Sequence, residues 1–357
     1  EALLICKDCS GKRPAWMKGQ LSIRRSIERK GSVDQLGAND LGATKRALPA
    51  FDDGFAIPSF LWAKVASGVS ELPVAYGACA FIYKLTLSEG RHVGVFALKV
   101  LKPKLAEDPR ECRAFEREVQ LISRLKHPHI LAAVAVSETP QRAPCVMLEW
   151  CALDVSHALG LDSAGSRRRV EAEWPPMDRL RLLTELATAL AWLHSGSALG
   201  LKVGRVIHRD IKPDNLGVTE ERSLRLLDFG LAVVVESVEN CAESFELTGS
   251  TGSRRYMAPE VALGRPYSTP ADTYSFTVTL WECLCLAGKP YAGLSIAEHQ
   301  LRVVVKNVRP AIPKGWDPEL ASLVESGWHA DPRQRASMAT MEGTLKKLIA
   351  RAKLEGH

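Results

Sequence analysis

A short run of the sequence, His208-Arg-Asp-Ile-Lys-Pro-Asp-Asn215, concentrates charged and amide side chains, and Asp228-Phe-Gly230 follows it. The side-chain oxygens of Asn215 and Asp228 are hard ligands, which suit Mg²⁺. The ammonium of Lys212 is a compact point charge that suits a phosphate. Each side chain alone would be explained as a surface charge in a turn. That explanation does not account for all of them together in this order.

A third motif, Tyr256-Met-Ala-Pro-Glu260, lies further along the chain. In this order and at this spacing, the three motifs resemble the catalytic loop, the metal-binding loop and the end of the activation segment of eukaryotic protein kinases. One such motif would be weak, whereas three in order are not explained by chance. The resemblance implies transfer of the γ-phosphoryl group of ATP, which depends on positioning and on charge neutralisation.

The resemblance also implies a role for each polar residue of the first two motifs. Asp210 would accept the proton of the substrate hydroxyl, and Lys212 would contact the transferring phosphate, so both are expected to be catalytic. Asn215 and Asp228 would bind Mg²⁺, the expected cofactor beside ATP. A lysine at position 212 is the serine/threonine form of the loop, so protein Ser and Thr hydroxyls are the implied acceptors.

The amino-terminal half supplies the nucleotide-binding residues that the resemblance requires. Lys99, in Phe96-Ala-Leu-Lys99, would contact the α- and β-phosphates of ATP, and Glu118 would pair with it. Glu116 is the alternative partner, but it lies two residues away and faces another side of the helix. The remaining expected ATP-binding positions are Gly77, Ile82, Ala97, the gatekeeper Leu148, and the hinge residues Glu149 and Cys151 with Trp150 between them.

Two features depart from the kinase pattern. The three glycine positions of the phosphate loop become Ala75, Gly77 and Ala80, so only the middle glycine is present. Because alanine disfavours a positive φ, we expect a higher Michaelis constant for ATP if the loop needs that conformation. The second departure is Gly217, where the family has an apolar side chain beneath the adenine; Val218 is a candidate to compensate.

Further landmarks follow the catalytic motifs. Asp272 resembles the aspartate that anchors the catalytic loop, and Arg335 resembles the arginine that pairs with Glu260. Ser253 occupies the hydroxyl position that braces the catalytic aspartate. Arg209 precedes Asp210, as in kinases that hold a phosphorylated activation segment, and an upstream activating kinase would then be a partner. The expected phosphorylation sites of that segment are Thr248, Ser250 and Thr251.

The run from Thr248 to Glu260 most resembles the tyrosine-kinase-like group of serine/threonine kinases. Two alternatives to an active protein kinase stay open. The altered phosphate loop and Gly217 favour a non-catalytic, kinase-like scaffold, whereas the presence of every chemically required side chain argues against it. A kinase of small molecules on the same fold is disfavoured by the activation segment, which serves protein substrates.

Hydrophobic periodicity predicts the elements that must position these residues. Strands are expected at 93–100, 130–136 and 145–150, and a helix over Phe115–Leu125. Helices are expected over Leu180–Leu193 and near 271–286, 297–307, 317–327 and 337–352, with a solvated loop at 165–169. The expected fold is α+β and bilobal, with a small lobe at 57–149, a hinge at 149–152 and a helical lobe at 153–350. Tails are expected at 1–56, flexible and basic, and at 351–357.

Composition excludes several classes of protein. Hydrophobic residues make up 46% and charged residues 25% of the sequence, as in ordinary globular proteins. A net charge of +6 is too balanced to indicate a nucleic-acid partner. We identify no apolar run long enough for a membrane span. The nine cysteines do not form a disulfide framework, and Cys6 and Cys9 lack partners for a zinc site. A cytoplasmic protein is expected, with the nucleus as the alternative.

Overall fold

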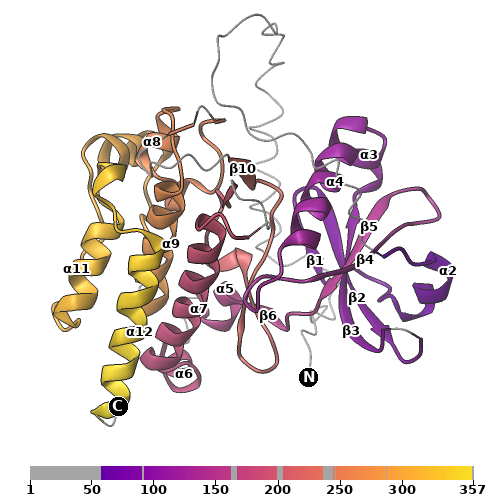
Figure 1. Ribbon diagram of the computed structural model, residues 1–357, viewed down its shortest axis with the longest axis horizontal. Helices are drawn as coiled ribbons and strands as arrows, with labels where there is room; N and C mark the ends of the chain where they lie inside the picture. The colour runs from indigo at the N-terminus through magenta and orange to yellow at the C-terminus, as the bar shows by residue number, and fades with distance from the viewer. Residues whose placement is uncertain are drawn as a thin grey trace, which may run out of the picture. The chain divides into compact units, whose positions relative to one another are not determined.

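Five antiparallel strands form the sheet of the amino-terminal lobe, in the order β1-β2-β3-β5-β4 (Figure 1). The structure is a computed structural model that describes residues 58–355 except 91, 162–166, 199–203, 236–243, 246 and 287. The expected tail at 1–56 lies outside the described residues. The strands are β1 (Ala75–Tyr76), β2 (Ala80–Leu87), β3 (Gly94–Leu101), β4 (Ala133–Glu138) and β5 (Pro144–Glu149).

The register of this sheet brings four expected ATP-site residues to one face. Ala97 and Lys99 are two residues apart in β3, so their side chains share a face. Across the sheet, Ala97 lies opposite Leu148 of β5, and Lys99 lies opposite Ile82 of β2. Because directly opposed residues also share a face, strand pairing alone assembles this part of the site.

One long helix, α4 (Pro109–Arg124), accompanies the sheet. Asp108 caps its first turn by accepting a hydrogen bond from the backbone N–H of Arg110 at 2.8 Å, and Pro109 occupies the first helical position, where no N–H is needed. Its apolar face, with Phe115, Val119 and Ile122, is buried. The short helices of this lobe are α2 (Trp62–Val65), η1 (Ala66–Gly68) and α3 (Pro103–Ala106).

The carboxyl-terminal lobe is mainly helical, which confirms the predicted α+β bilobal fold. Its α-helices are α5 (Val155–Ala158), α6 (Arg167–Glu173), α7 (Pro176–His194), α8 (Pro259–Ala262), α9 (Pro270–Cys285), α10 (Ile296–His299), α11 (Pro318–Gly327) and α12 (Met338–Leu354). Short 3₁₀ and π turns are η2 (Pro213–Asn215), η3 (Arg254–Tyr256), η4 (Gln300–Val305, π) and η5 (Pro332–Gln334). Its strands are β6 (Leu153–Asp154), β7 (Arg205–Ile207), β8 (Leu216–Val218), β9 (Leu224–Leu226) and β10 (Val233–Val235).

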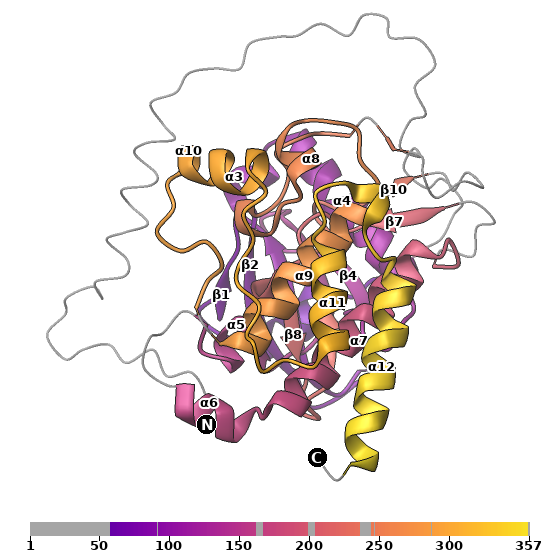
Figure 2. The ribbon, with the colours of Figure 1, turned by 90° about the vertical axis from the view of Figure 1, so that its left-hand side faces the viewer.

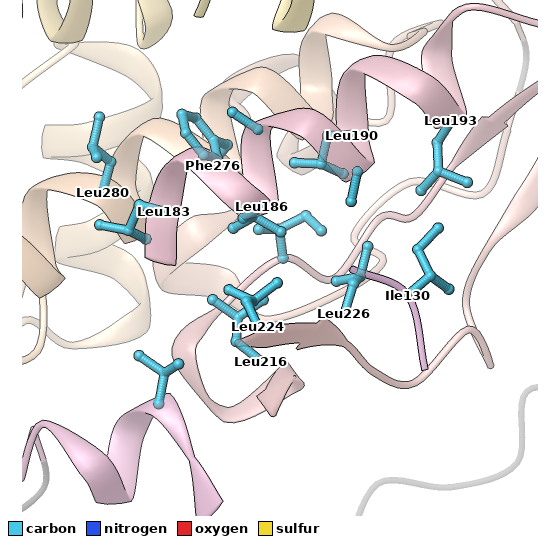
Figure 3. Close-up of a cluster of buried hydrophobic side chains, with 14 of the residues drawn as sticks. Ile130, Leu183, Leu186, Leu190, Leu193, Leu216, Leu224, Leu226, Phe276 and Leu280 are labelled. Carbon is cyan, nitrogen blue, oxygen red and sulfur yellow. The ribbon is translucent and has the colours of Figure 1, made fainter. Parts of the chain in front are cut away.

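The core of this lobe lies between α7, α9 and the β8–β9 hairpin. Figure 3 shows Leu183, Leu186 and Leu190 of α7 among side chains from the hairpin and from α9. Helix α12 packs along α7 on another side (Figure 2). This packing supports β8 and β9, and therefore the loops that carry the catalytic motifs. None of the helices in the described part of the chain is long and apolar enough to span a membrane.

Several elements differ from the sequence-based expectation. The loop expected at 165–169 is wrong in part, because α6 begins at Arg167. Arg169 pairs with Glu173 one turn later at 2.7 Å, a spacing that stabilises a helix. The strand expected from residue 130 begins only at Ala133, since Ile130 instead makes an isolated bridge to Leu226. The helix expected at 297–307 consists of the short α10 followed by the π-helical turn η4.

Candidate active site

A buried carboxylate holds the backbone of the catalytic loop. Asp272, near the start of α9, is fully buried and accepts hydrogen bonds from the N–H groups of His208 at 2.8 Å and Arg209 at 2.9 Å. His194 of α7 contacts the same carboxylate through Nε2 at 3.0 Å. Burial alone would raise the pKa of Asp272, but the hydrogen bonds from His194 and His208 lower it below its usual range. An ionised Asp272 therefore anchors the loop.

The side chain of Asp210 is oriented from three directions. Its Oδ1 accepts from the backbone N–H of Ser253 at 2.8 Å, and its Oδ2 accepts from Lys212 Nζ at 2.8 Å and from Asn215 Nδ2 at 2.9 Å. Burial would raise the pKa of Asp210, but the bonds from Lys212 and Ser253 hold it below its usual range. The carboxylate is therefore ionised and positioned to accept a proton.

Lys99 and Glu118 form the ion pair that joins β3 to α4. Lys99 Nζ lies 2.5 Å from Glu118 Oε1 and 3.5 Å from Asp228 Oδ1. Burial would lower the pKa of Lys99, but these two carboxylates raise it above its usual range, so the ammonium stays charged. Glu116, the alternative partner, is exposed. The structure thus brings the ammonium expected at the nucleotide phosphates next to the carboxylate expected to bind the metal.

The two expected metal ligands offer a donor set that fits Mg²⁺. Asn215 uses Nδ2 to donate to both the backbone carbonyl and the carboxylate of Asp210, which leaves its Oδ1 as an acceptor. The side chain of Asp228 is half exposed and keeps its carboxylate available. Two protein oxygens, completed by phosphate and water oxygens, are the coordination that Mg²⁺ prefers.

The hinge begins at the end of β5, and a side-chain contact joins it to the β8–β9 hairpin. Arg225 Nε donates a bifurcated hydrogen bond to both carboxylate oxygens of Glu149, at 2.9 and 3.0 Å, so the Glu149 side chain does not project into the ATP site. Leu148 is buried at the gatekeeper position. Cys151 lies against Gly217 of β8. Burial raises the pKa of the Cys151 thiol to about 12, and the thiol therefore behaves as a small apolar group.

Cys151 explains the glycine at position 217. A Cβ added to Gly217 would lie 2.6 Å from the Cys151 Sγ and 2.9 Å from its Cβ, too close for any side chain. Val218 does not compensate, because neighbouring residues of a strand face opposite sides, and it is buried in the core. The hinge cysteine therefore occupies the space that a side chain at 217 would need.

This contact predicts a coupled pair of substitutions. Gly217→Ala is expected to destabilise the protein by about 1–3 kcal/mol through overpacking. Adding Cys151→Gly removes the two atoms nearest to the new Cβ, leaving Leu227 Cδ2 at 3.1 Å, and should recover at least about 1 kcal/mol as a coupling free energy. Urea unfolding of the two single variants and the double variant measures the coupling. Gly315→Ala is the matched control, since a Cβ there meets no atom within 4 Å. Additive single effects would contradict the steric explanation.

The backbone of the phosphate loop does not adopt the positive φ that glycines at positions 75 and 80 would permit. Ala75 lies in β1 and Ala80 in β2, and neither of these residues nor Gly77 has a positive φ. The conformational cost expected from the two alanines is therefore absent. The turn between them is held instead by Lys102, whose Nζ donates to the carbonyls of Gly77 and Ala78.

Two side-chain contacts hold the end of the activation segment against the rest of the lobe. Arg335 donates to both oxygens of Glu260, at 2.7 and 2.8 Å, and both side chains are almost fully buried. Ser253 Oγ accepts from Lys212 Nζ at 2.8 Å, which places this hydroxyl at the catalytic carboxylate as expected for a bracing residue. The segment therefore contacts both the catalytic loop and the core of the lobe.

Three further residues of the site carried no role in the sequence-based interpretation. His194 supports Asp272, and Lys102 holds the phosphate loop. Gly252 has a φ of +92°, and a Cβ there would lie 2.2 Å from the carbonyl oxygen of Arg209. In the sequence, the only indication of this close approach is the glycine itself, which directly precedes Ser253. Nothing local signals His194 or Lys102, because their partners are distant in the chain.

The two lobes, the Lys99–Glu118 pair and the Asp210 cluster define a protein kinase domain. The sequence profile of the family described as protein tyrosine and serine/threonine kinase matches residues 72–345. The chain belongs to this family.

Relatives of known name agree with this assignment. The chain is 30% identical to the serine/threonine/tyrosine-protein kinase HT1 of Arabidopsis thaliana, over 76% of this chain and 64% of HT1. It is 29% identical to a probable serine/threonine-protein kinase of Dictyostelium discoideum, over 81% of this chain and 28% of that protein. It is 30% identical to the Arabidopsis serine/threonine-protein kinase CTR1, over 67% of this chain and 27% of CTR1. These relatives are consistent with the tyrosine-kinase-like group. The chain spans less than two thirds of the length of each.

Proposed function

We propose that this chain is an active protein kinase that transfers the γ-phosphoryl group of ATP to Ser and Thr hydroxyls of protein substrates. The observation that carries the proposal is the arrangement around Asp210. Its ionised carboxylate is oriented by Lys212, Asn215 and Ser253, and Lys99 is at the same time paired with Glu118. A kinase needs both groups in place at once for phosphoryl transfer.

Each residue then has a defined task. Asp210 accepts the proton of the attacking hydroxyl, and the ammonium of Lys212 lies beside it to neutralise charge on the transferring phosphate. Lys99 positions the other phosphates of the nucleotide. Asn215 and Asp228 would hold Mg²⁺, which supplies charge neutralisation at the phosphate oxygens when bound. The main alternative, a non-catalytic scaffold, loses support because the phosphate loop shows no strain at its alanines.

The direct test is incubation of the purified chain with labelled ATP, Mg²⁺ and generic acceptor proteins. We expect label on Ser or Thr, identified by mass spectrometry, and none when Mg²⁺ is chelated. ATP binding without transfer to any acceptor would favour the scaffold. Transfer only to small molecules would favour the kinase of small molecules.

We also propose bounds for the kinase domain and a cellular compartment for the protein. The kinase domain covers 57–350, with lobes at 57–149 and 153–350 joined by the hinge at 149–152. A role in cytoplasmic or nuclear signalling is supported by the thiols of Cys79, Cys112, Cys145, Cys151 and Cys283, which form no disulfide and suit a reducing compartment. Imaging of the tagged protein tests this placement.

Among the expected phosphorylation sites, the contacts favour Thr248. Arg209 Nη1 donates to Thr248 Oγ1 at 3.0 Å, and Thr251 donates to the same hydroxyl at 3.1 Å. In the described part of the chain, the side chain of Arg209 donates to Leu231, Thr248 and Tyr267, and to neither Ser250 nor Thr251. A phosphate on Thr248 would thus be formed beside the guanidinium of Arg209, which itself belongs to the catalytic loop.

Thr248→Val is therefore expected to lower the activity of the phosphorylated enzyme by about tenfold or more, since a phosphate–arginine contact is worth about 1.5–3 kcal/mol. Ser250→Ala, a matched change two residues away, should have little effect. Initial rates before and after treatment with an upstream kinase or a phosphatase measure both. Equal rates for phosphorylated and dephosphorylated protein, with the modification verified by mass spectrometry, would rule out this control.

A further inference from the structure

Lys102 contacts the turn of the phosphate loop through three successive carbonyl groups. It follows β3 directly and precedes α3. Its Nζ donates to the carbonyls of Gly77 at 2.6 Å and Ala78 at 2.7 Å, and its backbone N–H donates to the carbonyl of Cys79 at 3.0 Å. The ammonium also lies 5.4 Å from the centre of the Phe81 ring. One residue thus holds the whole turn from one side.

This contact determines where the amide groups of the turn point. The chain has no cis peptide bond, and in a trans peptide the N–H points opposite to the carbonyl of the preceding residue. With the carbonyls of Gly77 and Ala78 directed to Lys102, the N–H groups of Ala78 and Cys79 point away from it. Within the described residues, these two N–H groups donate to no hydrogen bond. Successive unpaired amides of this kind form an anion-binding concavity.

The turn leads directly into β2, and Ile82 of β2 lies opposite Lys99 of β3. Ile82 and Lys99 are both expected ATP-binding residues. The turn therefore adjoins the site that these two residues define.

We propose that Lys102 is a positioning residue that clamps the carbonyls of the phosphate loop, so that the amides of Ala78 and Cys79 face the phosphates of ATP. A glycine-rich loop reaches such an arrangement through backbone freedom, whereas this loop, with alanine at two glycine positions, is held by charge-assisted hydrogen bonds from a side chain. The proposal rests on ATP being the ligand of the proposed function.

The test compares Lys102→Met with Lys104→Met, an exposed lysine of α3 two residues away, and with Lys102→Arg. Lys102→Met removes the side-chain donor and keeps most of the unbranched apolar stem, so the Michaelis constant for ATP should rise about tenfold, while kcat changes less than about twofold. Lys102→Arg, which still offers donors to two carbonyls, should stay within about threefold of the unsubstituted chain. Lys104→Met should match the unsubstituted chain.

Two readouts that need no turnover accompany the kinetics. Calorimetric titration with ATP should show a dissociation constant that rises in parallel with the Michaelis constant. Hydrogen exchange at the amide of Gly77, which donates to the carbonyl of Ala80 across the turn, should quicken in the ligand-free Lys102→Met variant alone. If Lys102→Met left both the dissociation constant for ATP and the hydrogen-exchange rate unchanged, the proposed role of Lys102 would be wrong. An equal loss of affinity in Lys104→Met would also overturn it. If the unsubstituted chain binds ATP without transferring phosphate, the proposed function fails, and the Lys102→Met affinity still decides the clamp.

Discussion

Asp210→Asn is expected to lower kcat by about 10²–10⁴-fold, the usual contribution of a positioned general base. The ionised carboxylate is the acceptor for the substrate proton, and an amide cannot take that proton. ATP affinity should change little, because in the proposed function the phosphates are contacted by Lys99 and by the Mg²⁺ that Asn215 and Asp228 would hold, rather than by Asp210. Steady-state kinetics and ATP titration together separate the two effects.

The control for this variant is Asp214→Asn, which changes an exposed carboxylate in the same loop to the same amide. It should keep near-normal turnover. An asparagine at position 210 would also place an NH₂ group, itself a donor, opposite the donors of Lys212 or Ser253. Two facing donors form no hydrogen bond, so the melting temperature must be measured alongside activity to detect a loss of stability. Retention of more than about a tenth of the normal kcat by Asp210→Asn would contradict its assignment as the base.

Arg335→Met is expected to destabilise the protein by about 3–5 kcal/mol, because it leaves the carboxylate of Glu260 buried without its partner. Arg335 also donates to the carbonyls of His329 at 2.8 Å and Pro270 at 2.9 Å, and these acceptors would lose their donor. The ion pair fastens the end of the activation segment to the region before α12. The midpoint of urea unfolding measures the loss.

Two further variants make this prediction specific. Arg333→Met changes an arginine whose side chain is 78% exposed and should stay within about 0.5 kcal/mol of the unsubstituted chain. The double variant Glu260→Leu with Arg335→Met replaces both charges by apolar groups and should recover much of the stability. If Arg335→Met unfolded at the same urea concentration as Arg333→Met, the buried pair would not be a stabilising contact.

The residue types and spacings of the sequence were sufficient for the class of protein and its fold. His208–Asn215, Asp228–Gly230 and Tyr256–Glu260 are short segments whose chemistry is set by residues near one another in the chain. Hydrophobic periodicity likewise located α4, α7, α9 and α11, because the side chains of one helical face recur at fixed local intervals. The choice of Glu118 over Glu116 as the partner of Lys99 also followed from helical geometry, and the distance in the structure agrees with it.

Tertiary structure alone decided the details that distinguish this chain from the family pattern. Cys151 fills the space beside Gly217, and Lys102 holds the altered phosphate loop. Arg209 forms a hydrogen bond with the hydroxyl of Thr248, which distinguishes this residue among the expected phosphorylation sites. In each case the two partners lie far apart in the sequence and meet only because separate elements pack together. Local propensity carries no information about such contacts, since they depend on the register of the sheet and on how helices and loops are packed against it.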